Sequence, residues 1–177
     1  CRGPSPNAPS SRREETRSCV LWAETKIIGR GHSEILPPMA ARGLAAAGLK
    51  VGDLDRIGVV IGPGAFAGVR VGLAFARGLC LGTGAKAVGV SSLKALAASC
   101  AREGSVAPVF DARRGQVYAA LYDEALRERI EPFVASPEDA ARRLRDAGAV
   151  ALTLAGSGAA LVAPHFGASV SILDAAT

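Results

Sequence analysis

Residues 57–96 decide the fold class, and they read IGVVIGPGAFAGVRVGLAFARGLCLGTGAKAVGVSSLKAL. Residues 57–61 and 87–90 are short apolar runs of the kind that form buried strands. Between them, residues 69–81 have the length of a helix, and residues 92–102 predict a second helix. A strand, a helix and a strand in this order form a βαβ unit, which predicts parallel strands and an α/β fold.

A glycine turn, GPG at residues 62–64, connects the first strand to the helix. This geometry presents backbone N–H groups and a helix N-terminus to phosphate. Both common phosphate motifs are nevertheless incomplete. Val69 and Arg70 stand where a Walker loop has Lys and then Ser or Thr, and Ala67 replaces the third glycine of the dinucleotide fingerprint. Tight packing of the turn is therefore favoured over a phosphate site.

The helix predicted for residues 69–81 places both of its arginines on one narrow stripe, which consists of Arg70, Ala74, Arg77 and Leu81. The rest of its circumference is apolar or small. Interior glycines such as Gly72 and Gly78 cost about 1 kcal/mol each relative to alanine, so another backbone is expected to come close there. That backbone can belong to the protein's own sheet or to a partner, and the sequence leaves both interpretations open.

The segments that precede this unit are less regular. Residues 1–17 are rich in Pro, Ser and Arg without a hydrophobic period, and we interpret them as disordered or artefactual. Residues 18–31 predict one or two strands. Residues 33–48 predict a helix that two adjacent prolines disturb early and that Gly48 ends.

The residues after 104 predict a second set of strands and helices. Three strands are expected, the first two as a hairpin around ARRG, at residues 107–111, 116–123 and 127–134. A helix follows, in which Ser136 is the N-cap, Pro137 takes the first position and Asp139 lies three residues after the cap. Gly148 ends this helix. A strand, a glycine turn, a helix and a strand complete the pattern at residues 150–154, 156–158, 159 onward and 170–173.

Composition and charge limit the function classes. The 177 residues are 49% hydrophobic and 21% charged, which is a globular balance. Arg70 and Arg77 interrupt the most apolar helix, so no run of about 18 uninterrupted apolar residues occurs and we expect a soluble protein without a membrane span. Two of the five net positive charges lie in residues 1–17, and the other basic residues are scattered. Strong nucleic-acid binding by the chain alone is therefore not expected.

Catalytic and metal-binding patterns are sparse. The four cysteines lack CxxC spacing and are expected to be reduced, mostly buried thiols, at Cys1, Cys19, Cys80 and Cys100. His32 and His165 form no metal-binding pattern, and no serine lies in a GxSxG motif. The densest charged group beside a turn is Asp111, Arg113 and Arg114, where a solvated hairpin is favoured over a site.

Three separated motifs resemble the bacterial TsaB (YeaZ) family. They are HSEILPPM at residues 32–39, IGPGAFAGVRVGLAFARGLCLGTGAKAVGVSSLKALA at 61–97 and VFDARRGQVYAALYD at 109–123, and the resemblance covers about residues 31–160. It implies the actin-like ATPase (ASKHA, ribonuclease H-like) fold that sugar kinases and Hsp70 chaperones share, with two related lobes around a cleft. We expect an N-terminal lobe at residues 18–103 and a C-terminal lobe at 104–177.

The resemblance implies a non-catalytic subunit that is required to form N6-threonylcarbamoyladenosine at position 37 of tRNAs reading codons that begin with A. Family members pair with a catalytic paralogue, TsaD, and with an ATPase, TsaE, and they meet tRNA through the complex. A second copy of the chain is an alternative partner, and no cofactor is implied. In the paralogue an Asn-His-x-x-x-His segment holds a metal. Here Ser92 and Leu96 replace the two histidines and supply no imidazole, so we expect a cytoplasmic pseudoenzyme.

The chain departs from the family at both ends. The family begins with an apolar strand ending in Asp-Thr, whereas polar residues and proline precede Cys19, and its members continue beyond Thr177. We therefore expect truncation at both ends and an incomplete C-terminal lobe. The alternative functions are an actin-like nucleotide-binding ATPase or phosphotransferase, and a metallopeptidase. The missing histidines disfavour the peptidase, and Asp111 is the only acidic group near the glycine turns to hold Mg²⁺.

Two candidate sites result, and neither holds a catalytic or metal-ligating residue. The resemblance suggests that two helices pack on the equivalent pair of the paralogue as a four-helix bundle, through Leu36, Met39, Gly43, Arg70, Gly72, Leu73, Ala76 and Arg77. A nucleotide-like cleft is predicted at Gly62, Gly64, Gly68, Asp111, Arg113, Arg114, Gly156 and Gly158.

Overall fold

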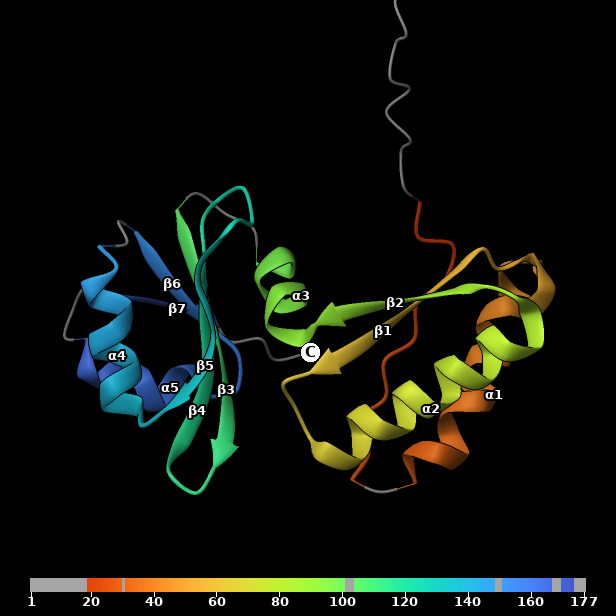
Figure 1. The fold of residues 1–177 in the computed structure, drawn as a ribbon, viewed down its shortest axis with the longest axis horizontal. Coiled ribbons are helices and arrows are strands. Elements are labelled where there is room, and N and C mark those ends of the chain that lie inside the picture. Colours follow the sequence, from red (N-terminus) through yellow and green to blue (C-terminus); the bar gives the residue numbers. More distant parts are fainter. Residues whose placement is uncertain (1–18, 30, 101–103, 149–150, 167–169, 174–177) are drawn as a thin grey trace, which may run out of the picture.

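A computed structural model of the chain describes residues 19–29, 31–100, 104–148, 151–166 and 170–173 (Figure 1). Its strands form two sheets. The first sheet consists of β1 and β2, and the second has five strands in the order β5-β4-β3-β6-β7. The interpretation of residues 1–17 as disordered and the prediction for Cys1 lie outside the described residues.

The elements of the first half are α1 His32–Ala46, a 3-10 helix Val51–Asp53, β1 Arg56–Gly62, α2 Phe66–Thr83, β2 Lys86–Ser91 and α3 Ser92–Ser99. Those of the second half are β3 Ser105–Arg113, β4 Gln116–Tyr122, β5 Glu128–Ala135, α4 Pro137–Asp146, β6 Leu152–Ala155, α5 Ala159–Val162, a 3-10 helix Ala163–His165 and β7 Ser171–Leu173.

The predicted βαβ unit is confirmed. β1 and β2 pair in parallel, with Ile57 opposite Ala87, and α2 packs on β1. α2 begins at Phe66, earlier than the predicted residue 69, so it starts directly after the glycine turn. It ends before Gly84, whose φ of 77° is the left-handed conformation common after helix C-termini.

α1 continues through Pro37 and Pro38, although the sequence predicts a disturbance there. Each proline removes one backbone donor, which leaves the carbonyl groups of Ser33 and Glu34 without their helical partners. Both of those residues are exposed, so water can satisfy the two carbonyl groups. As predicted, the helix ends before Gly48, which has a φ of 68°.

Residues 19–29 form no strand, contrary to the prediction for residues 18–31. A strand is stable only where the edge of another strand supplies hydrogen bonds, and no described strand pairs with this segment. The segment is tied to α1 by an ion pair instead. The guanidinium of Arg42 donates to the carboxylate of Glu24 at 2.7 Å, and this hydrogen bond lowers the pKa of Glu24.

Trp22 makes the second contact between this segment and α1. Its indole lies against Gly43, where a Cβ atom would come within 2.5 Å of the ring. Glycine is therefore needed at this position of the helix, because any side chain there would displace the indole.

The five-stranded sheet confirms most predictions for the second half. β3 and β4 form the antiparallel hairpin, β5 pairs antiparallel with β4, and β6 runs parallel to β3. α4 begins as predicted, because the hydroxyl of Ser136 accepts a hydrogen bond from the N–H of Asp139 at 3.1 Å. Helices cover both faces of this sheet, with α4 and α5 on one and α3 on the other (Figure 1).

The buried core lies almost entirely in the second half. One cluster, around Leu144, packs α4 and α5 on the five-stranded sheet. A second cluster packs Leu93 of α3 against Tyr122 on the opposite face. Among the described residues before Leu93, only Ala76 and Ala85 are buried. The elements α1, β1 and α2 therefore lack a substantial core of their own.

α2 is apolar yet open to solvent along most of its length. Within the described ranges it is the one helix that is long and apolar enough to cross a membrane by length and composition, and it contains Arg70 and Arg77. Of its 18 residues only Ala76 is buried, and Leu81 is 87% exposed. Large exposed apolar faces mark interaction sites, so this helix is a candidate interaction surface.

The cysteine prediction is only partly right. Cys100 is buried, Cys80 is half-buried and Cys19 is exposed, and all three are free thiols. The expectation of mostly buried cysteines is therefore met by Cys100 and wrong for Cys19, because the segment that contains Cys19 does not enter a sheet.

Substitution of Gly43 by alanine should displace Trp22, the single tryptophan of the chain. We expect tryptophan emission at longer wavelength, because the indole loses its contact with α1. Gly78→Ala is the matched control, since a Cβ there meets no atom within 4 Å. It should leave the emission unchanged and raise the free energy of unfolding by up to about 1 kcal/mol. Unchanged emission in Gly43→Ala would contradict the packing of Trp22 on α1.

Candidate functional site: a cleft and an outward helix face

The turn at residues 62–64 joins the first sheet to α2 and also contacts α3. Gly62 has a φ of 104°, a conformation that favours glycine, so the chain can leave β1 and enter α2 within a few residues. The hydroxyl of Ser92, at the start of α3, donates to the carbonyl of Pro63. The turn is thus held from both sides, by its own helix and by α3.

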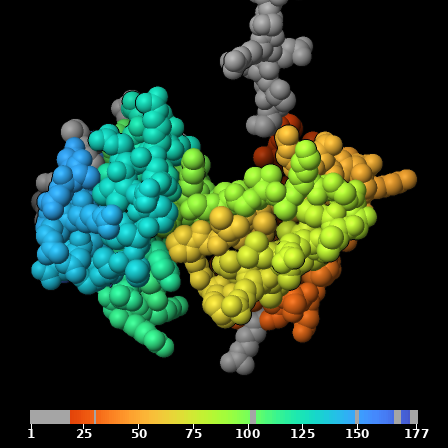
Figure 2. All heavy atoms as spheres, in the orientation of Figure 1, coloured from red at the N-terminus to blue at the C-terminus, as the bar shows by residue number. Residues whose placement is uncertain are grey.

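A cavity of about 690 Å³ opens between this turn and the hairpin of β3 and β4. Figure 2 shows the hollow between the hairpin, in green, and the start of α2, in yellow. Its lining includes several of the residues predicted for a nucleotide-like cleft, together with side chains from α2, α3 and β4. These residues are Gly64, Phe66, Gly68, Ser92, Asp111, Arg113, Tyr118 and Ser157.

The second glycine turn is packed tightly and leaves no room for a ligand. A Cβ on Gly156 would come within 2.7 Å of the carbonyl oxygen of Val109, and one on Gly158 within 2.8 Å of the Val109 side chain. The N–H of Gly158 also donates to the Val109 carbonyl at 2.9 Å. The structure therefore brings Gly64 and Gly68 into the cleft wall, whereas Gly156 and Gly158 serve packing against β3.

The charged group at the hairpin is partly neutralised within itself. The carboxylate of Asp111 accepts from the backbone N–H of Arg113 at 2.7 Å and lies 3.3 Å from its guanidinium. The N–H of Asp111 donates to the hydroxyl of Ser157 at 3.2 Å. Arg113 and Arg114 have φ values of 66° and 53°, which residues other than glycine and asparagine rarely adopt. The hydrogen bonds and the ion pair of Asp111 thus stabilise the hairpin.

Ser92 and Leu96, the residues at the histidine positions of the catalytic paralogue, both make packing contacts. Ser92 binds the Pro63 carbonyl, and the Leu96 side chain would lie 2.8 Å from a Cβ on Gly156. Across the described ranges, no three His, Cys, Asp or Glu residues lie close enough together to hold a metal ion.

Three residues predicted for the partner interface face the protein's own interior. Ala76 is 3% exposed, Gly72 lies over the side chain of Val59, and Gly43 is covered by Trp22. Ala76 is unavailable to a partner in this conformation, whereas Gly43 and Gly72 are half-buried and line surface grooves. Gly72 and Ala76 lie against internal elements, which was the simpler of the two interpretations, but a Cβ on Gly78 would meet no atom within 4 Å, contrary to the close approach expected there.

The other predicted interface residues remain accessible. Arg70 and Arg77 are exposed, and with Ala74 and Leu81 they form the outward stripe that the sequence predicts for α2. Leu73 is half-buried. Leu36 and Met39 are half-buried too and line a groove of about 490 Å³ between α1, α2 and the segment before α1.

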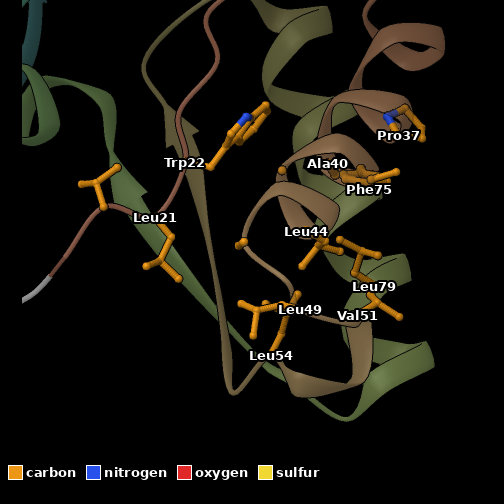
Figure 3. Close-up of a pocket in the computed structure, with 14 residues that line it drawn as sticks. Leu21, Trp22, Pro37, Ala40, Leu44, Leu49, Val51, Leu54, Phe75 and Leu79 are labelled. Atoms are coloured by element: carbon orange, nitrogen blue, oxygen red, sulfur yellow. The ribbon is translucent and has the colours of Figure 1, made fainter.

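A second groove, of about 680 Å³, lies between α1, α2 and the segment at residues 19–29 (Figure 3). Its walls are almost entirely apolar, and Trp22, Leu44, Leu54 and Leu79 lie around it. The sequence analysis did not identify this groove. Much of its wall comes from irregular segments, whose side-chain directions no periodic pattern reveals.

Phe66 is a further residue that the sequence analysis missed. It is 70% exposed at the first position of α2, and the guanidinium of Arg70 lies 3.6 Å from the centre of its ring. The prediction started the helix at residue 69 and so treated Phe66 as part of the turn. An aromatic residue placed one turn before an arginine was the available signal.

Comparisons with known proteins agree on one family. The family model described as "TsaD: tRNA N6-adenosine threonylcarbamoyltransferase" matches residues 25–171. The tRNA threonylcarbamoyladenosine biosynthesis protein TsaB of Escherichia coli is 34% identical over 117 residues, which cover 61% of this chain and 51% of that protein. TsaB of Bacillus subtilis is 38% identical over 123 residues, which cover 68% and 52%. The chain therefore spans about half the length of these curated relatives.

Two further comparisons concern a solved structure and a transferase. A crystal structure of a Pseudomonas aeruginosa protein with similarity to peptidase YEAZ has a TM-score of 0.74 and 30% identity, covering 86% of this chain and 72% of that one. A tRNA N6-adenosine threonylcarbamoyltransferase of Cereibacter sphaeroides is 47% identical over 68 residues, which cover 38% of this chain and 19% of that protein. The chain has the actin-like α/β fold and belongs to the threonylcarbamoyltransferase (TsaD) family, among its TsaB (YeaZ) members.

Proposed function

We propose that this chain is a non-catalytic subunit for N6-threonylcarbamoyladenosine formation at position 37 of tRNA, and that it acts by binding the catalytic paralogue TsaD. The observation that carries the proposal is the exposure of α2, an 18-residue apolar helix in which only Ala76 is buried. An apolar helix gains stability mainly by burying its face, so a second protein that covers α2 stabilises both proteins. The names of the TsaB relatives supply the reaction.

The partner surface consists of the outward faces of α1 and α2. On α2 it includes Arg70, Ala74, Arg77 and Leu81, and on α1 it includes Pro38, Ala41 and Ala45, all of which are exposed. The alanines allow two helix pairs to approach closely, as ridges and grooves of a four-helix bundle require. Arg70 and Arg77 lie on the same stripe and steer association with an acidic partner surface.

The site chemistry favours a supporting role over transfer by this chain alone. Ser92 and Leu96 stand where the paralogue has its metal-binding histidines, and both are used for packing. Neither side chain can replace an imidazole ligand. The transfer step is therefore assigned to TsaD, the ATPase TsaE joins the assembled complex, and tRNA reaches this chain within that complex in the cytoplasm.

An actin-like ATPase or phosphotransferase remains the alternative function. The cleft has the required position between the lobes, but Asp111 is the acidic residue in its lining and is engaged with Arg113. A nucleotide-hydrolysing site needs carboxylates that are free to hold Mg²⁺ near phosphate. The lining thus supports the alternative less well than the partner role, and a second copy of the chain on α2 is a competing occupant of the same surface.

The substitution Ala74→Lys tests the partner surface. Three positive charges would then line the exposed stripe, and an unpaired charge buried on binding costs about 3–5 kcal/mol, so we expect binding to TsaD to weaken about 100-fold or more. Calorimetry measures the binding, and circular dichroism checks the fold. Ala98→Lys, on the exposed surface of α3, is the matched control and should bind normally.

Ala76→Lys serves as the second control, because Ala76 is buried inside the chain and this variant should fail to fold. If Ala74→Lys is folded and binds TsaD as tightly as the unmodified chain, the outward stripe of α2 is not the partner surface.

The chain alone should transfer no threonylcarbamoyl group to tRNA. Unmodified tRNA is incubated with threonylcarbamoyl-adenylate in three reactions, which contain this chain alone, TsaD with TsaE, or all three proteins. The tRNA is then digested, and its nucleosides are separated and identified by mass spectrometry. We expect modified adenosine to accumulate efficiently only with all three proteins. Turnover by the chain alone would overturn the assignment of a non-catalytic role.

A further inference from the structure

The mouth of the cleft carries an exposed aromatic platform. Phe66 lines the cavity with 70% of its surface accessible, and the Arg70 guanidinium lies over its ring at 3.6 Å. An exposed phenylalanine has no role in the folded core. A flat apolar ring with a cation beside it is the combination that binds nucleobases by stacking.

Two arginines stand on the hairpin across the same cavity. The Arg113 side chain is 86% exposed and lines the cavity, and Arg114 follows it at the hairpin tip. Both residues adopt left-handed backbone conformations, and a turn of this kind is more easily formed by asparagine and glycine. No hydrogen bond or ion pair within the described residues involves the Arg114 guanidinium. Arg114 thus has a backbone conformation that is unfavourable for arginine, and its guanidinium has no intramolecular partner among the described residues.

The charge at this mouth is positive. Arg113 lines the cavity and pairs with its one lining carboxylate, Asp111, whereas Arg70 contacts the lining residue Phe66 and Arg114 follows Arg113 at the hairpin tip. The sequence analysis considered the basic residues scattered, because residue 70 and residues 113–114 are far apart in the chain. The fold brings Phe66, which Arg70 contacts, and Arg113 into the lining of one cavity. Serine and tyrosine hydroxyls from Ser92 and Tyr118 provide the polar wall between them.

We propose that this mouth binds single-stranded RNA, with one base stacked on the exposed ring of Phe66 and the neighbouring phosphates held by Arg113 and Arg114. The inference deepens the proposed function, since it rests on tRNA being the substrate of the complex, and it assigns this chain a contact with an unpaired region of that RNA. Arginine suits phosphate because its planar guanidinium donates two parallel hydrogen bonds. The cavity of about 690 Å³ is in the range that accommodates a nucleotide.

A strand of RNA fits these features better than a free nucleotide does. Arg113 and Arg114 are exposed and adjacent on the hairpin, where a continuous phosphate backbone can reach both of them at once. A mononucleotide that enters the cavity would meet Asp111 and small residues of the glycine turn there. The binding energy therefore comes from stacking and from rim phosphates, both of which a strand can use together.

The test uses a 10-nucleotide oligoadenylate with a fluorescent label, titrated with the full chain at several KCl concentrations. We expect weak binding, with a Kd of about 1–100 µM at low salt, because few phosphate contacts are available. Two phosphate contacts, at Arg113 and Arg114, give a plot of log affinity against log salt with a slope of about −1.4. Phe66→Ala should weaken binding about 5- to 100-fold, the range expected from one stacked base.

Two further variants separate charge from fold. Arg114→Gly removes one cation at a position whose φ suits glycine, so it should keep the hairpin and reduce the salt slope by about 0.7. Phe133→Ala is the matched control, because Arg143 lies 4.4 Å over the Phe133 ring in a similar pair on β5 and α4. It should leave RNA binding unchanged.

Three results would overturn the inference. These are an absence of oligoadenylate binding at low salt, equal loss of binding in Phe66→Ala and Phe133→Ala, and competition by AMP as strong as that by the oligonucleotide, which would make the cleft a mononucleotide site. A different result would refute the proposed function. Loss of RNA binding with normal TsaD binding refutes only the RNA contact, whereas failure to bind TsaD refutes the partner role itself.

Discussion

The limited burial of α2 within the chain is the constraint on which the rest of the structure depends. The five-stranded sheet has helices on both faces and two buried clusters, whereas among the described residues before Leu93 only two alanines are buried. Hydrophobic burial is the main source of stability, and α1, β1 and α2 have little of it within the described residues. The proposed partner surface would supply the burial that these elements lack.

Much of the fold could be predicted because its signals are local. The alternation of apolar runs with the glycine turn at 62–64 predicts β1, α2 and β2, and the cap at Ser136 predicts α4. Residues 19–29 could not be predicted in the same way, since strand formation depends on a distant edge. The orientation of α2 also depends on residues that are distant in the sequence. Gly72 and Ala76 look like partner contacts by spacing, and only the position of the sheet shows that they face inward.

The candidate site was predicted less completely than the fold. The hairpin with Asp111 and Arg113 was identified as a charged turn, and it does line the cleft. Phe66 was missed because the start of α2 was placed too late, and helix boundaries are weak sequence signals. The joint position of Arg70 and the hairpin arginines required the tertiary structure. Sites assembled from distant segments of a chain have this property, since no sequence spacing connects their parts.

Hydrogen–deuterium exchange of this chain, with and without TsaD, tests the central claim most directly. α2 should exchange quickly in the isolated chain, because few contacts protect it, and become strongly protected when TsaD is added. α4 provides the internal reference, because its buried face already packs on the five-stranded sheet, and its exchange should not change. Slow exchange of α2 that TsaD leaves unaltered, at concentrations where the two proteins bind, would contradict the account.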